Sequence, residues 1–162
     1  MLSTVEIEKI LSEIPDPEIP VINIKELGIL REVKVEGEKV FITITPTYSG
    51  CPAMRLIEDQ IKEVLHENKI ESFEVKSVLS PAWTTDWITD EAKQKLEDYG
   101  IAPPEKGSPN KSLLDPFGPK DIRCPHCKSK DVKMVSQFGS TACKAHYKCI
   151  ECLEPFDYFK CI

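Results

Sequence analysis

The 162-residue sequence contains no apolar run of about 18 residues, the length that a transmembrane helix needs, so it predicts no membrane span. It also predicts no secretory leader, because Met1–Thr4 leads directly into charged helical sequence. Both absences indicate a cytoplasmic protein, and thiols stay reduced in that compartment. The seven cysteines are therefore interpreted as metal ligands or reactive groups before disulfides.

Several motifs of cofactor chemistry are missing as well. The seven glycines form no glycine-rich loop of the kind that binds flavins and nucleotides. No pair of predicted helices carries the carboxylates and histidines of an oxygen-activating diiron site. The chain is therefore expected to have no catalytic activity of its own.

Basic charge is scarce and dispersed. The net charge is −6, and the eight basic and five acidic residues of 120–162 give that tail +3, which leaves −9 for residues 1–119. A mildly basic tail without an arginine cluster is weak evidence for nucleic-acid binding. An acidic body with a basic tail suits docking to another protein, although a plain solvated surface gives the same pattern.

Cysteine, in contrast, is concentrated in the tail, where six of the seven lie in the last 39 residues. Four of them form two C-x-x-C knuckles, Cys124 with Cys127 and Cys149 with Cys152, which are separated by 21 residues. Two such knuckles can bring four sulfurs to about 2.3 Å from one metal ion. The spacing predicts a structural zinc site in a β-ribbon over residues 121–162, with four-cysteinate iron or an iron–sulfur cluster as alternatives.

The other two tail cysteines, Cys143 and Cys161, allow two interpretations. Either they are small buried apolar residues, or they form a second thiol pair that carries metal or redox chemistry. A module of about 40 residues rarely folds without a metal or a disulfide. Folding of the ribbon is therefore expected to depend on its metal.

The first hundred residues alternate between helical and strand periodicity. Ser3 and Glu6 have the spacing of a capping box, and Pro15 must end the helix that follows. Later segments predict a hairpin of strands 29–35 and 40–45, and then a helix over 52–68. A strand over 73–78 and a short helix over 89–100 follow. The fold class is α+β, a small two-layer N-terminal domain of order α-β-β-α-β-α over residues 1–100. Residues 101–120, with five prolines and two glycines, predict a linker.

Cys51 stands apart from the other cysteines, in the loop Thr47–Cys51 that precedes the second helix. A helix N-terminus favours a thiolate through its macrodipole and its free N–H groups. A functional thiol is one interpretation, with the Thr47 hydroxyl beside it, and a plain buried cysteine is the other. A catalytic Cys–His pair is not favoured, because His66 lies about four turns along the same predicted helix.

Asp16 and Glu18 form a pair of carboxylates in a loop that prolines fix on either side. They suit acid–base or metal chemistry, and with Cys51 they suit a transient iron site. The alternative is that Asp16 only stops the first helix and that Glu18 is solvated.

The segment 16–21 with Leu27-Gly28, followed by Thr47-x-x-Gly50-Cys51-Pro52, resembles the SufT-like (MIP18-type) domain of iron–sulfur assembly factors. That resemblance covers residues 3–100. The later segments Ser80–Ile88, 138–145 and 154–161 extend it over the whole chain to the PaaD family, also called PaaJ. Proteins of that family are accessory components of the bacterial phenylacetyl-CoA 1,2-epoxidase system.

The resemblance implies a maturation factor that assists insertion of iron or iron–sulfur into the oxygenase components during aerobic phenylacetate degradation. It implies that Cys51 handles iron, with Asp16, Glu18 and Thr47 as its neighbours. The oxygenase and reductase subunits and the iron–sulfur assembly machinery are the implied partners, and a homodimer is left open. The competing hypotheses are a structural or electron-transfer subunit of the oxygenase and a nucleic-acid-binding zinc ribbon.

Overall fold

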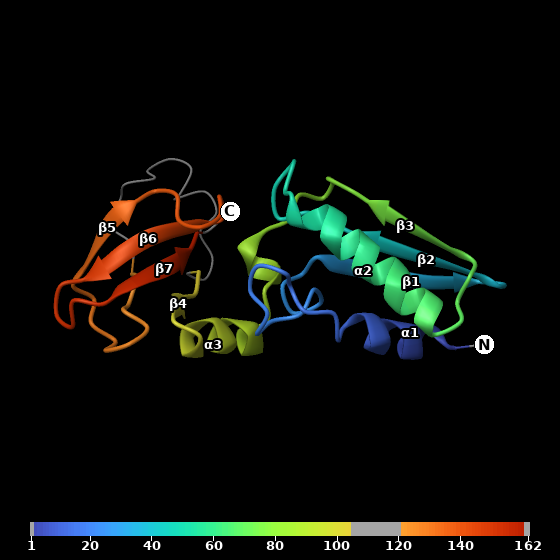
Figure 1. The fold of residues 1–162 in the computed structure, drawn as a ribbon, viewed down its shortest axis with the longest axis horizontal. Coiled ribbons are helices and arrows are strands. Elements are labelled where there is room, and N and C mark those ends of the chain that lie inside the picture. Colours follow the sequence, from blue (N-terminus) through green and yellow to red (C-terminus); the bar gives the residue numbers. More distant parts are fainter. Residues whose placement is uncertain (1, 105–120, 161–162) are drawn as a thin grey trace. The chain divides into compact units, whose positions relative to one another are not determined.

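The computed structural model describes residues 2–104 and 121–160. It divides into two compact units, Met1–Trp83 and Thr84–Ile162 (Figure 1). The α+β class predicted from the sequence is confirmed, with helices and sheets in both parts. No described helix is long and apolar enough to span a membrane.

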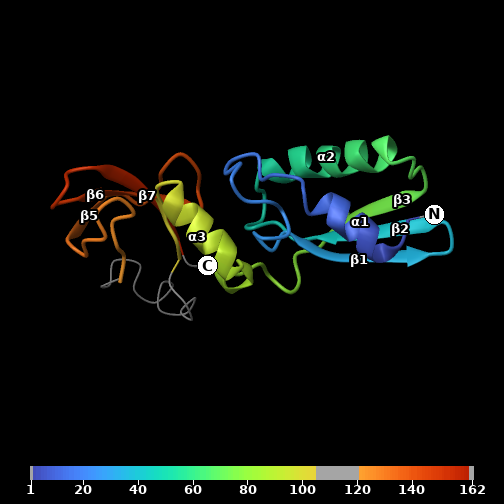
Figure 2. The same cartoon turned by 90° about the horizontal axis from the view of Figure 1, so that it is seen from below.

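The first unit packs two helices on a three-stranded sheet of order β1-β2-β3 (Figures 1 and 2). Its elements follow the predicted order: α1 Thr4–Leu11, β1 Leu30–Glu36, β2 Lys39–Ile44, α2 Ala53–Glu67 and β3 Phe73–Ser77. Strands β1 and β2 form the predicted antiparallel hairpin. Strand β3 runs parallel to β2, which requires the crossover that α2 supplies.

Burial alternates along β2, where Val40, Ile42 and Ile44 are buried and the residues between them are partly exposed. The buried side chains face the helices. On α2, four buried residues at helical spacing pack toward the sheet: Met54, Ile57, Ile61 and Leu65. One face of the sheet is thus covered, which leaves the other to solvent.

The ends of α1 follow the sequence signals. Ser3 Oγ accepts from the Glu6 N–H, and the Glu6 carboxylate accepts from the Ser3 N–H at 2.7 Å, so the predicted capping box is present. The helix ends at Leu11, before Pro15. At the start of α2, Pro52 is the N-cap rather than the first helical residue, and no side chain caps the first turn.

The second unit holds the short helix η1 Thr85–Trp87, the helix α3 Asp90–Asp98 and a four-stranded sheet of order β4-β7-β6-β5. The strands are β4 Ile101–Ala102, β5 Val132–Ser136, β6 Lys144–Cys149 and β7 Pro155–Phe159. Neighbours are antiparallel except β4 and β7, which pair in parallel.

The division of the chain differs from the domain boundaries that the sequence predicts. Helix α3 belongs to the second unit, although the prediction extends the first domain to residue 100. Ile101 and Ala102 form β4 and pair with Asp157 and Tyr158, whereas the prediction places them in the linker. Two residues are too few to show a strand period, so the sequence carries no signal for β4.

Candidate metal centre and Cys51 loop

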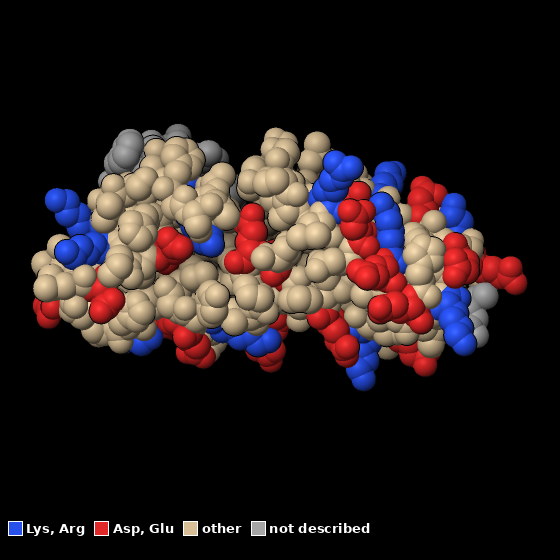
Figure 3. All heavy atoms as spheres, in the orientation of Figure 1, with Lys and Arg blue, Asp and Glu red and all other residues tan. Residues whose placement is uncertain are grey.

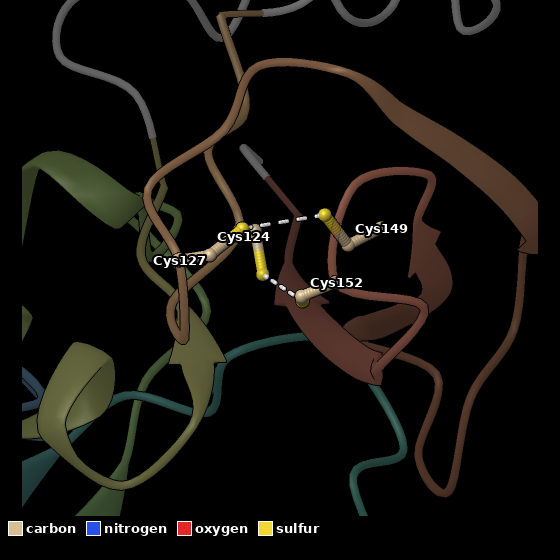
Figure 4. A group of neighbouring side chains, drawn as sticks. All are labelled: Cys124, Cys127, Cys149 and Cys152. Carbon is tan, nitrogen blue, oxygen red and sulfur yellow. Dashed lines mark hydrogen bonds between the residues drawn. The ribbon is translucent and has the colours of Figure 1, made fainter.

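The four knuckle cysteines converge in the second unit, as predicted (Figure 4). Their ligand atoms all lie within 4.8 Å of one another. Sγ of Cys124 is 3.7 Å from Sγ of Cys152, and Sγ of Cys127 is 3.5 Å from Sγ of Cys149. Four sulfurs at about 2.3 Å from a central ion would be about 3.8 Å apart, so this donor set fits a tetrahedral metal ion.

Each knuckle is closed by backbone hydrogen bonds. The Cys124 N–H donates to the Ser129 carbonyl at 2.9 Å, and the Lys128 N–H returns to the Cys124 carbonyl at 2.9 Å. In the second knuckle the Cys149 N–H donates to the Glu154 carbonyl at 3.0 Å. The backbone therefore fixes the sulfurs from both sides.

The residue after each knuckle has a left-handed backbone. Lys128 has φ 65° and Leu153 has φ 64°, so the two turns repeat one conformation. Non-glycine residues rarely adopt this region. Composition gives no signal for these positions, because neither residue is a glycine.

The metal centre also forms part of the core of the second unit. Cys124 and Cys149 are fully buried in it, while Cys127 is exposed and Cys152 is partly exposed. The other members of this core are apolar: Ala102, Ile122, Ala145, Tyr147, Phe156 and Tyr158. Among the described residues this core is small, so we expect binding of the metal and folding of the unit to be coupled.

The two thiols of the second knuckle have different pKa values. The backbone N–H of Cys152 stabilises the Cys149 thiolate and lowers its pKa to about 7, although burial opposes this shift. The Glu154 N–H acts to lower the pKa of Cys152, but burial and the neighbouring thiols raise that pKa to about 12. Four thiolates this close would repel one another, so a cation at their centre is needed to keep all of them ionised.

Cys143 is not among the four converging cysteines. It is buried just before β6, and its Sγ lies 3.0 Å from Oγ1 of Thr141. Cys161 lies outside the described residues, so a second thiol pair stays a prediction.

Cys51 lies in the loop between β2 and α2 and is partly exposed. Its N–H donates to the Tyr48 carbonyl at 3.2 Å, and its carbonyl accepts from the Met54 N–H at 3.3 Å. Thr47 in the same loop is buried. The thiol therefore stands two residues before an uncapped helix N-terminus, as the sequence predicts.

Asp16 is buried, and its carboxylate shapes its own loop. Oδ1 accepts from the N–H groups of Glu18 at 2.9 Å and Ile19 at 2.8 Å. The Asp16 N–H in turn donates to the Ile22 carbonyl at 2.8 Å. Glu18 is partly exposed, so of the two side chains it is the more accessible.

Backbone hydrogen bonds connect the two loops through the start of the sheet. The Ile29 N–H donates to the Ile24 carbonyl at 2.9 Å, and the Thr45 N–H donates to the Ile29 carbonyl at 2.9 Å. The segment 15–28 and the loop 46–52 lie at the same end of the unit (Figures 1 and 2). Oγ1 of Thr45 is buried there with no hydrogen-bond partner in the part of the chain that the structure describes, a feature that sequence reasoning missed.

Comparison with known proteins identifies the family. The chain is 50% identical over 157 residues to a subunit of the "Putative 1,2-phenylacetyl-CoA epoxidase" of Escherichia coli (strain K12), covering 97% of this chain and 92% of that protein. This chain belongs to the PaaD family. The family model "PaaD zinc beta ribbon domain" matches residues 108–160 of this PaaD-family chain, a range that contains all four converging cysteines.

The first unit of this PaaD-family chain matches a second model, "Iron-sulfur cluster assembly protein", over residues 4–80. It is 42% identical over 83 residues to the Staphylococcus aureus (strain USA300) "Fe-S protein maturation auxiliary factor SufT", covering 50% of this chain and 93% of that protein. The solved structure "Domain of Unknown Function DUF59 from Bacillus anthracis" superposes with a TM-score of 0.54 at 29% identity, covering 57% of this chain and 90% of that one. The resemblances predicted from the sequence are confirmed in both halves.

Proposed function

We propose that this PaaD-family protein is a maturation factor of a phenylacetyl-CoA epoxidase system, which assists insertion of iron or iron–sulfur into the oxygenase components. The observation that carries this proposal is an iron–sulfur assembly domain joined in one chain to a PaaD ribbon. A relative of the first domain is named as an Fe–S protein maturation factor, and the whole-length relative is named as an epoxidase subunit. An accessory role in maturation of the epoxidase agrees with the names of both relatives.

In this proposal Cys51 is the thiol that handles iron. It is the only cysteine of the first unit, it is partly exposed, and the N–H groups of the following helix turn have no side-chain cap. Glu18 is an accessible carboxylate of the neighbouring loop, Asp16 accepts hydrogen bonds within that loop, and Thr47 is a buried neighbour in the thiol loop. A thiolate and a carboxylate together suit a transiently bound iron ion as cargo.

The ribbon in this proposal holds zinc for structure. Four thiolates complete a tetrahedral shell, and a closed shell leaves no position for a substrate or water. Its role would be to hold the second unit folded for contact with epoxidase subunits or with iron–sulfur assembly proteins in the cytoplasm. A structural or electron-transfer subunit is the alternative, and it would require redox-active iron in the ribbon.

A strain that depends on this protein for active epoxidase tests the proposal. The expected result is that Cys51→Ala abolishes epoxidase activity in cells and leaves the purified oxygenase poor in iron, while the variant itself folds and retains its ribbon metal. Ser49→Ala, a neighbour in the same loop, is the matched control and should leave activity unchanged. Chemical reconstitution with iron and sulfide should restore part of the activity.

Two results would contradict the proposal. Full epoxidase activity with Cys51→Ala would show that the Cys51 thiol is not required for maturation of the epoxidase. A stoichiometric requirement for this protein in every turnover, with fully metallated partners present, would make it a working subunit. Metal analysis of protein purified without oxygen also distinguishes the two hypotheses. Zinc alone favours a maturation factor, whereas stoichiometric iron and sulfide favour an electron-transfer subunit.

A further inference from the structure

A groove of about 470 Å³ runs between the end of α1 and the second half of α2, within the first unit. Its floor is apolar, formed by Ile10, Ile14 and Val64, with Pro15 at one wall. Ile14 is buried, and Ile10 and Val64 are partly exposed. The groove is large enough to take several side chains of a partner.

Three exposed glutamates rim this groove: Glu13, Glu63 and Glu67. Among the residues that the structure describes, none of the three carboxylates has a cationic partner. Glu63 and Glu67 are spaced i, i+4 on α2, where like charges destabilise a helix by about 0.2–0.5 kcal/mol. Glu67 is also the last residue of α2, the helix end at which a negative charge is unfavourable. A cationic ligand would offset both costs.

The Gln60 side chain adds a hydrogen-bond acceptor. It lines the groove, and its Oε1 is buried with no hydrogen-bond donor among the described residues. A buried acceptor without a donor costs about 1–3 kcal/mol. The terminal amide torsion is soft, so the oxygen can turn into the groove and accept from an ammonium or guanidinium group.

We propose that this groove docks a basic amphipathic helix of a partner protein. Aliphatic side chains of that helix would lie on Ile10, Ile14 and Val64, and its lysines or arginines would pair with the glutamate rim. Over the face that carries α2, acidic side chains lie beside basic ones, so the complementarity rests on the groove's own glutamates (Figure 3). An apolar floor with a charged rim is the usual setting for a helix bound in a groove.

The groove is separate from the Cys51 loop. Cys51 precedes the first turn of α2, and the groove lies along its last two turns, so the first half of the helix, about 10 Å, separates them. Docking at the groove therefore leaves the thiol free, and the inference does not depend on the function proposed for Cys51.

A synthetic helical peptide tests the proposal on the full chain with its metal bound. The probe has 14 residues, with leucine at helical spacing on one face and lysine flanking that face, and a control peptide has glutamate in place of lysine. Titration followed by NMR should shift the amides of residues 10–14 and 60–68 with the lysine peptide alone. Binding should weaken as salt is raised, because exposed charges are screened.

Matched variants locate the binding. Glu63→Lys should weaken affinity for the lysine peptide roughly tenfold, while Glu58→Lys, the same change on α2 outside the groove, should have little effect. Gln60→Leu should weaken binding without lowering the stability of the free protein, because it removes an acceptor that has no donor.

Four outcomes would overturn the inference. The first two are no binding of the lysine peptide up to millimolar concentration, and an equal loss of peptide affinity with Glu63→Lys and Glu58→Lys. The third is that the shifted amides lie outside the groove, and the fourth is that spermine alone shifts the same amides equally. The last would identify a polyamine site rather than a protein-docking groove.

Discussion

Lys128 and Leu153 occupy equivalent places, each directly after the second cysteine of a knuckle, and each has a left-handed backbone. The left-handed region costs an L-residue roughly 1–2 kcal/mol, and a bulky side chain such as leucine gains no local hydrogen bond in return. Leu153 is also 63% exposed, so its side chain contributes little packing to offset the strain. We expect metal binding by the four cysteines to hold both turns in this conformation.

Leu153→Gly is therefore expected to stabilise the metal-loaded second unit. The gain should be up to about 1 kcal/mol after the entropy of the added glycine is subtracted, and thermal unfolding of the zinc-bound protein measures it. Ile150→Gly in the same knuckle is the control and should destabilise the unit, because Ile150 has no positive φ to relieve. Equal destabilisation by both changes would show that the left-handed turn stores no strain.

At the scale of elements, periodicity and capping signals predicted most of the first unit. The capping box at Ser3, the hairpin and the apolar face of α2 all appear where the pattern placed them. Strand β4 could not be predicted, since its two residues pair only through the distant strand β7. The spacing of the knuckles predicted the metal centre, whereas the turn conformations and the lone Thr45 hydroxyl arise from tertiary packing that a pattern does not encode.

The hairpin of β5 and β6 carries an unfavourable pair. Lys133 and Lys148 lie directly opposite each other, both exposed, and neither forms an ion pair within the described part of the chain. Like charges at directly opposed positions destabilise a sheet. Strand β5 is also an edge of its sheet, where lysine discourages pairing with another chain.

Lys133→Glu should raise the free energy of unfolding of the second unit by about 0.2–1 kcal/mol, because it converts repulsion across the hairpin into attraction. Denaturant unfolding at low salt measures the gain, which should shrink at about 1 M salt. Lys130→Glu is the control, since Lys130 pairs with Asp121 at 2.8 Å and its reversal should lower stability. A salt-independent change would mean that packing rather than charge is responsible.

For the whole molecule, the two units have different sources of stability. The first has a sheet and two helices with a large apolar interior, whereas the second has a small core of which two metal-site cysteines are members. Removal of the metal should therefore unfold one unit and leave the other intact. The apparent binding free energy of structural zinc is large, about 10–16 kcal/mol in zinc-finger peptides at pH 7, and it contributes to folding.

Chelation at neutral pH, or Cys124→Ser, should collapse the NMR amide dispersion of residues 121–160 and preserve that of residues 4–77. Cys143→Ala is the matched control, because Cys143 stands outside the converging four, and it should retain both metal content and dispersion. A second unit that stays folded without bound metal would refute the coupling.

The two tryptophans belong to different units although they are only four positions apart. The Trp83 indole is buried and donates through Nε1 to the Leu27 carbonyl at 2.9 Å, next to the loops of the first unit, whereas Trp87 is partly exposed and lies in η1 of the second. The chain thus carries a built-in pair of optical probes. With Trp87→Phe, the remaining fluorescence reports the first unit, and with Trp83→Phe it reports the second. Unfolding or ligand binding in either unit can then be followed by tryptophan fluorescence in the full-length protein, without any attached label.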